Sequence, residues 1–504
     1  MSGRRARLSA LLHGAGIESA VAVGPDPEIC GAALDSRKIE QGDLFFALPG
    51  LEADGVDFVP DAVRRGASAV VSNQPRPEWL DSDVAWVQVA EPRRIAGLLA
   101  REYYGRPDLA LTVVGITGTN GKTTVAHLVE SIGNAAGRHT GRIGTVGLAF
   151  GEVERPSERT TPEAPDFYRL LAEMRDESID LVSMEVSSHA LALHRVEGAQ
   201  FATAAFLNLG RDHLDFHGTE EAYFEAKARL FEALDESQAA VVPADSDYGL
   251  RLRRSTRARV LSFGRSASAD VRLCDEYCGL DGSRAVLQTP QGSLPVRTFL
   301  LGRFNLDNVA AAAACALAVD LPMEAIASGV LALQVVPGRV EPVHRGQPFS
   351  VVVDFAHTEQ ALRNLLDWIG QLTKGRLIVV FGCGGDRDRG KRADMGRAAA
   401  ESGAQLYLTS DNPRNEDPRQ IMDQVHEGVR SVAGGAERCL LIDDRREAIE
   451  AAIGLAQPGD TVVIAGKGHE TTQTVGKQVL PFDDRQVASE ALDRLGWRER
   501  RRGA

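Results

Sequence analysis

One stretch, residues 111–124, constrains the fold of this chain more than any other. It reads LTVVGITGTNGKTT, so an apolar, β-branched run passes into glycines, a lysine and two threonines. The run predicts a buried strand, and the residues after it predict a loop whose backbone N–H groups face one anion at the start of a helix. Lys122 suits a terminal phosphate, and Thr123 suits its Mg²⁺. The stretch therefore predicts a nucleotide site.

The glycine spacing of this loop departs from the general phosphate-loop rule. The rule asks for glycine where the chain has Ile116, and the chain carries instead the shorter GTNGKTT of residues 118–124. An ordinary turn capped by Thr117 or Thr119 is the alternative, but a chance Gly-Lys-Thr rarely follows so regular a buried strand. The nucleotide contacts that we predict here come from Gly118, Thr119, Asn120, Gly121, Lys122, Thr123 and Thr124.

Composition limits the class of protein. The 504 residues favour about three domains, and 43% hydrophobic with 25% charged residues is typical of a globular chain. A net charge of −13 argues against nucleic-acid and anionic-membrane partners, which need a cationic face. The six cysteines have no paired spacing, which is typical of reduced thiols in a cytoplasm. No segment predicts a membrane span or a secretory signal, so we expect a cytoplasmic protein without membrane insertion.

The pattern of elements predicts three α/β units. The first, residues 1–100, has short strands between polar turns. In the second, residues 101–337, strands alternate with helices, which predicts a parallel sheet covered on both faces. The third, residues 338–504, follows a hinge near Pro337 and predicts a Rossmann-like sheet. Strands are expected at 43–48, 69–72 and 84–89 in the first unit, and at 350–355, 377–381, 405–409, 440–442 and 461–465 in the third.

Polar side chains follow two expected strands of the central unit. Glu185 ends the run at 179–185, and the strand at 201–207 leads into a segment that contains His213. Open α/β sheets bind ligands at the carboxyl ends of their strands, where a carboxylate and an imidazole can share a metal. Each residue alone is more often an ion-pair partner or part of a helix start. Downstream of a phosphate loop, the pair favours Mg²⁺.

Two further features of the central unit each allow a functional and a purely structural interpretation. Asn305 and Asn308 share one face of an expected helix, and their amides suit either an adenine edge or helix capping, which is preferred for an isolated pair. Lys227 lies in an amphipathic helix at 221–230, where a lysine is ordinarily solvated.

Loops after the strands of the third unit carry charged side chains. The segment 382–387 reads GCGGDR, but it lacks the full G-x-G-x-x-G and a strand-end acid at the expected distance, which excludes NAD. Arg387, Arg414 and Glu470 would place two guanidiniums and a carboxylate at one sheet edge. That set suits a substrate with both carboxylates and an amine.

Together these motifs resemble the Mur ligase family, and the match covers nearly the whole chain. The shortened phosphate loop is this family's usual form. The matching segments are LDSR (34–37), GTNGKTT (118–124), TTP (160–162), MEVSSH (184–189), NLGRDHLDFH (208–217), GRFNLDN (302–308), DFAHT (354–358), GCGGDRDRGKR (382–392), DNPR (411–414) and AGKGHE (465–470).

The resemblance implies a three-domain α/β enzyme. Residues 1–100 would bind a UDP-muramoyl substrate, 101–337 would bind ATP, and 338–504 would form a Rossmann-like domain for an amino acid. The implied activity joins meso-diaminopimelate to the D-Glu of UDP-MurNAc-L-Ala-D-Glu through an acyl phosphate, in cytoplasmic peptidoglycan precursor synthesis. In this family, arginine at the fourth place of DNPR, here Arg414, goes with diaminopimelate, whose second carboxylate is a bidentate partner that lysine lacks. A monomer is expected.

The resemblance also implies roles for individual residues. The catalytic residues would be Lys122, Glu185, His213 and Lys227, with Mg²⁺ on Thr123, Glu185, His213 and a carbamylated Lys227. ATP would also contact Asn305, Arg339 and Asp354. The UDP-linked substrate would contact Ser36, Thr160, Thr161, Ser187 and Arg195, and diaminopimelate would contact Arg387, Asp411, Asn412, Pro413, Arg414, Gly466 and Glu470.

Three positions depart from the family pattern. Arg159, Leu193 and Phe355 stand where asparagine, glutamine and tyrosine are frequent, which weakens individual contacts with the nucleotide sugar. The alternatives to this interpretation are a P-loop kinase or ATPase and a non-catalytic, nucleotide-gated scaffold. Within the ligases, a lysine-adding or a folylpolyglutamate-type enzyme is nearest.

Overall fold

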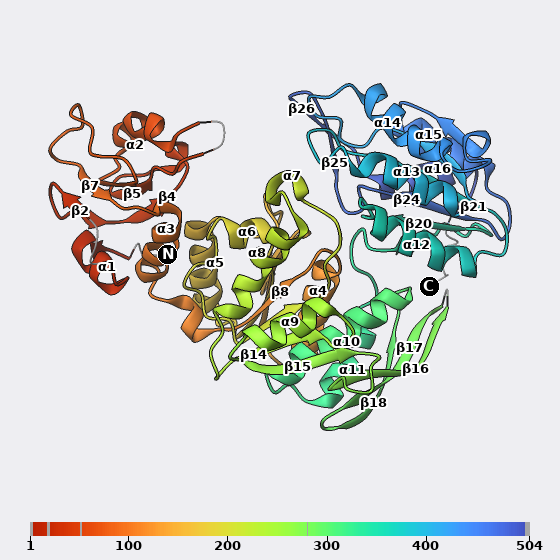
Figure 1. Ribbon diagram of the computed structural model, residues 1–504, viewed down its shortest axis with the longest axis horizontal. Coiled ribbons are helices and arrows are strands. Elements are labelled where there is room, and N and C mark those ends of the chain that lie inside the picture. Colours follow the sequence, from red (N-terminus) through yellow and green to blue (C-terminus); the bar gives the residue numbers. More distant parts are fainter. Residues whose placement is uncertain (1–3, 18–20, 51–52, 280, 499–504) are drawn as a thin grey trace.

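The computed structural model describes residues 4–17, 21–50, 53–279 and 281–498. Figure 1 shows three α/β bodies that follow one another along the chain, from red through green to blue. The domain limits predicted above, 1–100, 101–337 and 338–504, stay a prediction. Within the described ranges, no helix is long and apolar enough to cross a bilayer.

The N-terminal body is built on a five-stranded sheet of order β2-β7-β6-β5-β4. It is parallel except for β2, and helix α3 buries Ala96, Leu99 and Tyr103 in its core. Its elements are β1 Ala6–Arg7, α1 Leu8–Gly14, β2 Val21–Val23, β3 Glu28–Ile29, β4 Gly31–Ala33, β5 Asp43–Phe46, α2 Val59–Arg65, β6 Ala69–Ser72, β7 Ala85–Gln88 and α3 Pro92–Tyr103.

The central body contains an eleven-stranded sheet of order β11-β10-β9-β12-β8-β13-β14-β15-β16-β17-β18. Its elements are β8 Thr112–Thr117, α4 Lys122–Ala135, β9 Thr140–Gly144, β10 Gly147–Phe150, β11 Val153–Arg155, α5 Ala164–Asp176, β12 Leu181–Glu185, α6 Ser188–Ala192, β13 Thr203–Phe206, α7 Leu214–His217, α8 Glu220–Glu232, β14 Ala239–Pro243, α9 Asp247–Ser255, β15 Arg259–Gly264, β16 Val271–Gly279, β17 Gly282–Thr289, β18 Gly292–Thr298, α10 Arg303–Ala318 and α11 Met323–Ala332.

The edges of this sheet differ from the all-parallel sheet that the sequence predicted. In the sheet order, the seven strands β9-β12-β8-β13-β14-β15-β16 each pair in parallel with their neighbours. At one edge β10 and β11, and at the other β17 and β18, are added by antiparallel pairing. Only residues 145 and 146 join β9 to β10, and so short a connection permits antiparallel pairing alone. The parallel core, which carries the phosphate loop, is as expected.

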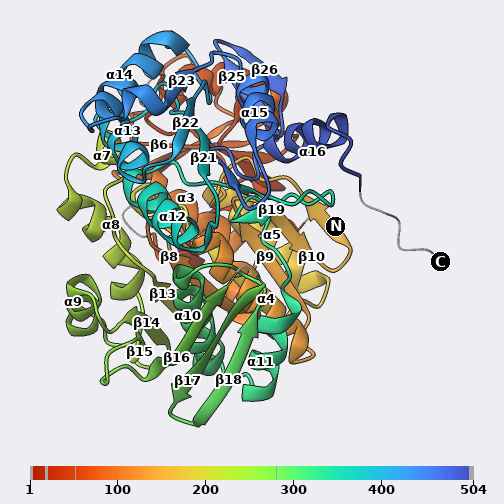
Figure 2. The ribbon, with the colours of Figure 1, turned by 90° about the vertical axis from the view of Figure 1, so that its right-hand side faces the viewer.

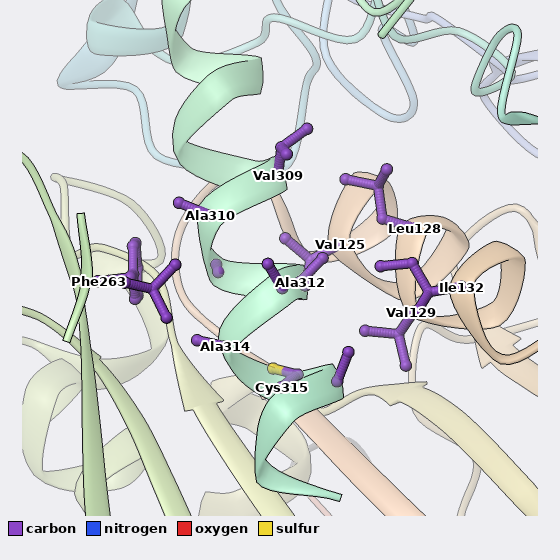
Figure 3. Packing of buried hydrophobic residues seen from close by; sticks show 14 of the residues in the cluster. Val125, Leu128, Val129, Ile132, Phe263, Val309, Ala310, Ala312, Ala314 and Cys315 are labelled. Carbon is purple, nitrogen blue, oxygen red and sulfur yellow. The ribbon is translucent and has the colours of Figure 1, made fainter. Parts of the chain in front are cut away.

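Helix α10 packs against α4 on one face of this sheet (Figure 3). Its alanines from Ala310 to Ala314 are fully buried, as are Val125, Leu128 and Val129 of α4. Small side chains let the two helix backbones approach closely, which confirms the close packing predicted for the alanine-rich segment. The contact fixes α4, and with it the phosphate loop at its start.

The C-terminal body has a six-stranded sheet of order β19-β20-β24-β21-β22-β23, parallel except for β19. Figure 2 shows this body above the central one, with β19 near their junction. Its elements are β19 Glu341–Pro342, β20 Ser350–Asp354, α12 Glu359–Leu372, β21 Leu377–Phe381, α13 Lys391–Glu401, β22 Gln405–Leu408, α14 Pro418–Arg430, β23 Cys439–Leu441, α15 Arg445–Leu455, β24 Thr461–Ala465, β25 Thr472–Val475, β26 Gln478–Pro481 and α16 Asp484–Arg494.

Candidate active site

The phosphate loop curls around its own lysine between β8 and α4. Lys122 donates from Nζ to the carbonyl oxygens of Gly118 (2.9 Å) and Thr119 (3.0 Å). Gly121 has φ of 90° and precedes the first residue of α4, and a Cβ there would lie 2.4 Å from Asn308 Oδ1. Glycine is required at this position by both the backbone conformation and the close approach of the neighbouring amide.

The two asparagines of α10 face this loop and do not cap their helix. The N-cap residue is Gly302, and no side chain accepts a capping hydrogen bond from the first turn of the helix, so the capping alternative is wrong. Asn308 donates from Nδ2 to Asn305 Oδ1 (2.9 Å), and Asn305 donates to the Leu301 carbonyl (2.8 Å). The pair therefore forms a fixed amide surface beside Gly121.

A cavity of about 390 Å³ lies where the central and C-terminal bodies meet the phosphate loop. This volume is in the range of small-molecule sites. Gln360 and Asn364 also line it, and sequence reasoning missed them; their i,i+4 spacing on one face of α12 was the available signal. The predicted ATP residues that line it are Asn120, Gly121, Thr124, Asn305, Arg339 and Asp354.

Arg339 reaches across from the C-terminal body to the phosphate loop. Its Nη2 donates to Thr123 Oγ1 (3.1 Å), and its guanidinium lies 4.6 Å from the centre of the Phe355 ring. Asp354 accepts hydrogen bonds from the N–H groups of Val340 (2.8 Å) and Ala356 (2.7 Å). Burial raises the pKa of Asp354, and the charge of Arg339 partly offsets that rise. The two bodies thus share one wall of the cavity.

Glu185 ends β12 and is almost completely buried. Its two oxygens accept hydrogen bonds from the Thr145 N–H (2.8 Å) and hydroxyl (3.1 Å). Thr161 donates to the Glu185 carbonyl (2.9 Å) and accepts from the Ser187 N–H (3.0 Å). These bonds tie the segment that carries Thr161 to the end of the strand.

Four of the five residues predicted for the UDP-linked substrate gather in this network. Arg195 donates to the Thr161 carbonyl (3.2 Å) and pairs with Glu163 (2.9 Å), and the Thr160 hydroxyl lies 3.0 Å from that of Thr145. Ser36 lies apart from them in the N-terminal body, where its hydroxyl donates to Asp61 (3.0 Å).

Lys227 lies on α8 but is buried, so the solvated-lysine alternative is wrong. Its side chain is 1% exposed, and Nζ donates to the Gly118 carbonyl (3.1 Å) at 4.5 Å from the centre of the Tyr223 ring. Burial lowers the pKa of Lys227 well below its ordinary value, and the charge of nearby Lys122 lowers it further. Both effects favour the neutral form of the amine.

His213 precedes α7 in a left-handed conformation, with φ of 54°. Burial lowers its pKa, although the carboxylate of Asp212, 3.4 Å from Nε2, acts in the opposite direction. In the described part of the chain, no three His, Cys, Asp or Glu side chains gather as a metal cage. Mg²⁺ usually keeps several waters and phosphate oxygens as ligands, so a few protein donors suffice.

The residues predicted for the amino acid lie around one loop of the C-terminal body. Arg414 has a left-handed backbone conformation, with φ of 52°. Its backbone N–H donates to the Thr474 carbonyl (3.1 Å), and its Nη1 donates to the Gly385 carbonyl (2.7 Å). Burial lowers the pKa of Arg414, and the charge of the exposed Arg387 lowers it further. Gly466 leaves room for Asp411, because a Cβ there would lie 2.7 Å from Asp411 Oδ2. Arg414 is half-buried, unlike an arginine in a surface turn.

Comparison with known proteins places this arrangement in a family. Three family models match in chain order: "Mur ligase family, catalytic domain" at 28–104, "Mur ligase middle domain" at 116–316 and "Mur ligase, glutamate ligase domain" at 338–468. A protein of Solibacter usitatus named UDP-N-acetylmuramoyl-L-alanyl-D-glutamate--2,6-diaminopimelate ligase is 45% identical over 476 residues, 94% of this chain and 95% of its own length. The chain belongs to the Mur ligase family.

Two other Mur ligases support the same placement. A Geobacillus kaustophilus protein with the same name as the Solibacter protein is 43% identical over 479 residues, 94% of this chain and 96% of that protein. A solved structure titled UDP-N-acetylmuramoyl-L-alanyl-D-glutamate--2,6-diaminopimelate ligase has a TM-score of 0.66 and 34% identity. It covers 93% of this chain and 95% of the other. The likeness therefore extends over all three bodies.

Proposed function

We propose that this chain is an ATP-dependent ligase that adds meso-diaminopimelate to the D-Glu of UDP-MurNAc-L-Ala-D-Glu in peptidoglycan precursor synthesis. The observation that carries the proposal is the full-length likeness, at 43% and 45% identity, to two enzymes named for that reaction. The proposal includes a cytoplasmic enzyme, which six free cysteines support. It also includes a monomer, since one chain supplies the residues predicted for all three substrates.

The proposed division of the site follows the geometry. ATP occupies the cavity beside the phosphate loop, with its adenine end near Asn305 and its phosphates near Lys122. The UDP-linked substrate brings its D-Glu to the network around Thr161 and Ser187, next to Glu185. The amino acid binds at Arg414.

In the first step, a carboxylate oxygen of D-Glu bonds to the γ-phosphorus of ATP while the bond to the ADP oxygen breaks. Two anions must approach each other, so the barrier falls where cationic groups neutralise the transferring phosphoryl oxygens. Lys122, held by two carbonyls of its own loop, supplies such a charge. Burial lowers the pKa of Lys122, and Glu185 counters this shift.

In the second step, the neutral amine of diaminopimelate attacks the acyl carbon. The new C–N bond forms as the bond to the phosphate oxygen breaks, and the proton that the amine loses is taken up by the departing phosphate. Arg414 and Arg387 hold carboxylate groups of the amino acid and so orient the amine toward the acyl phosphate.

The residues present suit Mg²⁺. Thr123, Glu185, His213 and a carbamylated Lys227 would hold it. When bound, Mg²⁺ would supply positive charge to the phosphoryl oxygens. One support for this fit is that the side chains at these positions offer oxygen and nitrogen donors. The other is the lowered pKa of Lys227, because a neutral amine is the form that adds to CO₂ and releases a proton to give a carbamate.

Product analysis tests the proposal. Purified enzyme is given ATP, Mg²⁺, UDP-MurNAc-L-Ala-D-Glu and an equimolar mixture of meso-diaminopimelate, L-lysine and D-glutamate, and the products are identified by mass spectrometry. We expect the diaminopimelate tripeptide, with one ADP released per amide bond. ADP release without the amine would indicate a kinase or ATPase, and a lysine or glutamate product would contradict the proposed amine.

A further inference from the structure

Lys467, in the loop after β24, is buried next to the residues predicted to bind the amino acid. Its side chain is 0% exposed. Nζ donates to Glu470 Oε2 (2.9 Å), Asn412 Oδ1 (3.3 Å) and the Thr472 carbonyl (2.6 Å). An ammonium has three N–H donors, so this set uses all of them. Lys467 thus joins two predicted substrate residues to strand β25.

These bonds fix the orientation of the Asn412 amide. Its Oδ1 accepts from Lys467 and also from the Thr474 N–H (2.9 Å), so both donors select the same end of the amide. Nδ2 must then lie on the other side, where it donates one hydrogen to Glu470 Oε2 (2.8 Å). Within the described residues, the second Nδ2 hydrogen has no acceptor.

The same bonds leave one oxygen of Glu470 for a ligand. Oε2 accepts from Lys467 and Asn412, whereas Oε1 accepts no hydrogen bond from any described residue. The side chain is 33% exposed, so Oε1 is accessible. Burial raises the pKa of Glu470, but Lys467 and Asn412 lower it by more, which keeps the carboxylate ionised. An ionised oxygen of this kind accepts a hydrogen bond from an ammonium.

Glu470 and Arg414 both lie in loops that contact strand β25 and its neighbour Asn412. The carboxylate of Glu470 is close enough to raise the pKa of Arg414 against the effect of burial. Strand β25 accepts the Arg414 N–H at Thr474, and Gly476 donates to the Arg414 carbonyl (2.7 Å). One carboxylate-binding guanidinium and one ammonium-binding carboxylate therefore lie together, which matches an amino-acid centre that carries both groups.

We infer that Lys467 is a positioning residue of the amino-acid site. It fixes Glu470 and Asn412 so that a carboxylate oxygen and an amide N–H are left for the amine and carboxylate of the substrate end that Arg414 binds. The inference rests on the proposed function. Without this ammonium, the Asn412 amide loses one of the two donors that orient it, and Glu470 loses its counter-ion.

Three amino acids separate this role from a general structural one. meso-Diaminopimelate carries both groups at its far end, 2-aminopimelate lacks the far amine, and L-lysine lacks the far carboxylate. Steady-state kinetics are measured for wild type and Lys467→Met, with Lys477→Met as the matched control. Lys477 is an exposed lysine in the β25–β26 turn, so the same substitution there leaves the network intact.

For Lys467→Met we expect KM for meso-diaminopimelate to rise roughly 10²-fold with little change in kcat or in KM for ATP, as loss of a buried charged partner implies. The preference for meso-diaminopimelate over 2-aminopimelate should fall at least about tenfold, while the preference over L-lysine persists because Arg414 remains. The control should match wild type. An equal loss of kcat/KM for all three amino acids would overturn the inference.

Folding is checked by thermal unfolding of each full-length variant. Should Lys467→Met not fold, Glu470→Gln takes its place, because it removes the same ammonium acceptor and keeps the lysine. It should lose the preference over 2-aminopimelate, and an unchanged preference would overturn the inference. Wild-type product from meso-diaminopimelate is established first, so that a failure of the proposed function is seen separately, before any variant is compared.

Discussion

Two buried lysines of this molecule lie in opposite surroundings. Lys227, beside the phosphate loop, donates one hydrogen bond, to the Gly118 carbonyl, and has Lys122 as a charged neighbour. Lys467, beside the amino-acid loop, donates three and has Glu470 as a counter-ion. Both side chains are almost completely shielded from water.

The difference shows that burial alone does not decide what a lysine does. Lys467 is in direct ion-pair contact with a carboxylate, that of Glu470 at 2.9 Å, whereas Lys227 makes no ion pair with any described residue and lies near the charge of Lys122. Lys227 therefore suits chemistry that needs a neutral amine, and Lys467 suits a permanent charge that orients its neighbours. Each prediction below tests one side of this contrast.

The largest effect is expected for Lys227→Ala. If the neutral amine carries a carbamate that supports Mg²⁺, its removal should lower kcat by at least about 10²-fold, the size typical of a lost electrostatic contact to the transition state. Steady-state ADP release, coupled to product detection, measures the loss. Added short carboxylic acids should restore part of the activity, because they place an anion in the vacated space.

The control for this prediction is Lys374→Ala, which changes an exposed lysine between α12 and β21. It should behave as wild type. Full activity of Lys227→Ala, or the same response to carboxylic acids in both variants, would show that the low pKa of Lys227 has no part in turnover.

A smaller effect, confined to one substrate, is expected for Arg414→Ala. Removing a guanidinium that pairs with a carboxylate should raise KM for meso-diaminopimelate roughly 10²-fold and leave KM for ATP nearly unchanged. Arg419→Ala, an exposed arginine on α14, is the control. Wild type should also reject L-lysine by about 10⁴-fold, since lysine would leave the guanidinium unpaired. Equal use of both amino acids would contradict this role.

Local sequence patterns predicted most strands and the end of each strand where polar residues gather. The run at 377–381 coincides with β21, and the run at 461–465 with β24. Period and composition determine such buried strands without help from distant residues. They could not show the antiparallel edges of the central sheet, because short connections decide the pairing there.

The site itself was less accessible to the sequence. Lys227 follows the pattern of a solvated helix residue, and only the packing of α8 beneath the phosphate loop buries it. Gln360 and Asn364 enter the cavity because the C-terminal body is placed against the central one. The sequence did not indicate a role for Lys467, because that role depends on a hydrogen bond to Asn412, which is far from it in sequence. Long-range contacts of this kind leave no periodic signal.

Lys227 lies on the central body and Lys467 on the C-terminal body. The proposed reaction therefore needs the ATP site and the amino-acid site to come close together. We expect binding of an ATP analogue with both other substrates to close the C-terminal body on the central one, about the segment near Pro337 and Gly338. Small-angle X-ray scattering should show a modest decrease in radius of gyration, by a few per cent. The ATP analogue alone is the control. An unchanged radius with all three ligands would indicate a preformed site.

The smallest expected effect is on stability, and it concerns the ion pair between Glu416 and Arg392 beside the loops that carry Arg387 and Arg414. Glu416 accepts hydrogen bonds from both Nη atoms of the buried Arg392 (2.8 and 3.0 Å) and from the Asp386 N–H (2.7 Å). Hydrogen bonds from Arg392 lower the pKa of Glu416 from its ordinary 4.5 to about 2. Its contribution to stability is therefore present above about pH 4.5 and is lost as the pH falls toward 2.

Urea unfolding of wild type and Glu416→Gln tests this contribution. Above pH 5 the variant should be less stable by no more than about 1–2 kcal/mol, because solvent screens part of the interaction. Between about pH 4.5 and pH 2.5 the difference should shrink, since the wild-type carboxylate takes up a proton that the glutamine cannot. Glu437→Gln, at an exposed position before β23, should show no such trend. A difference that stays constant with pH would mean that Glu416 holds the loops by shape rather than by charge, and Lys467 would then be the stronger case for charge-based positioning in this body.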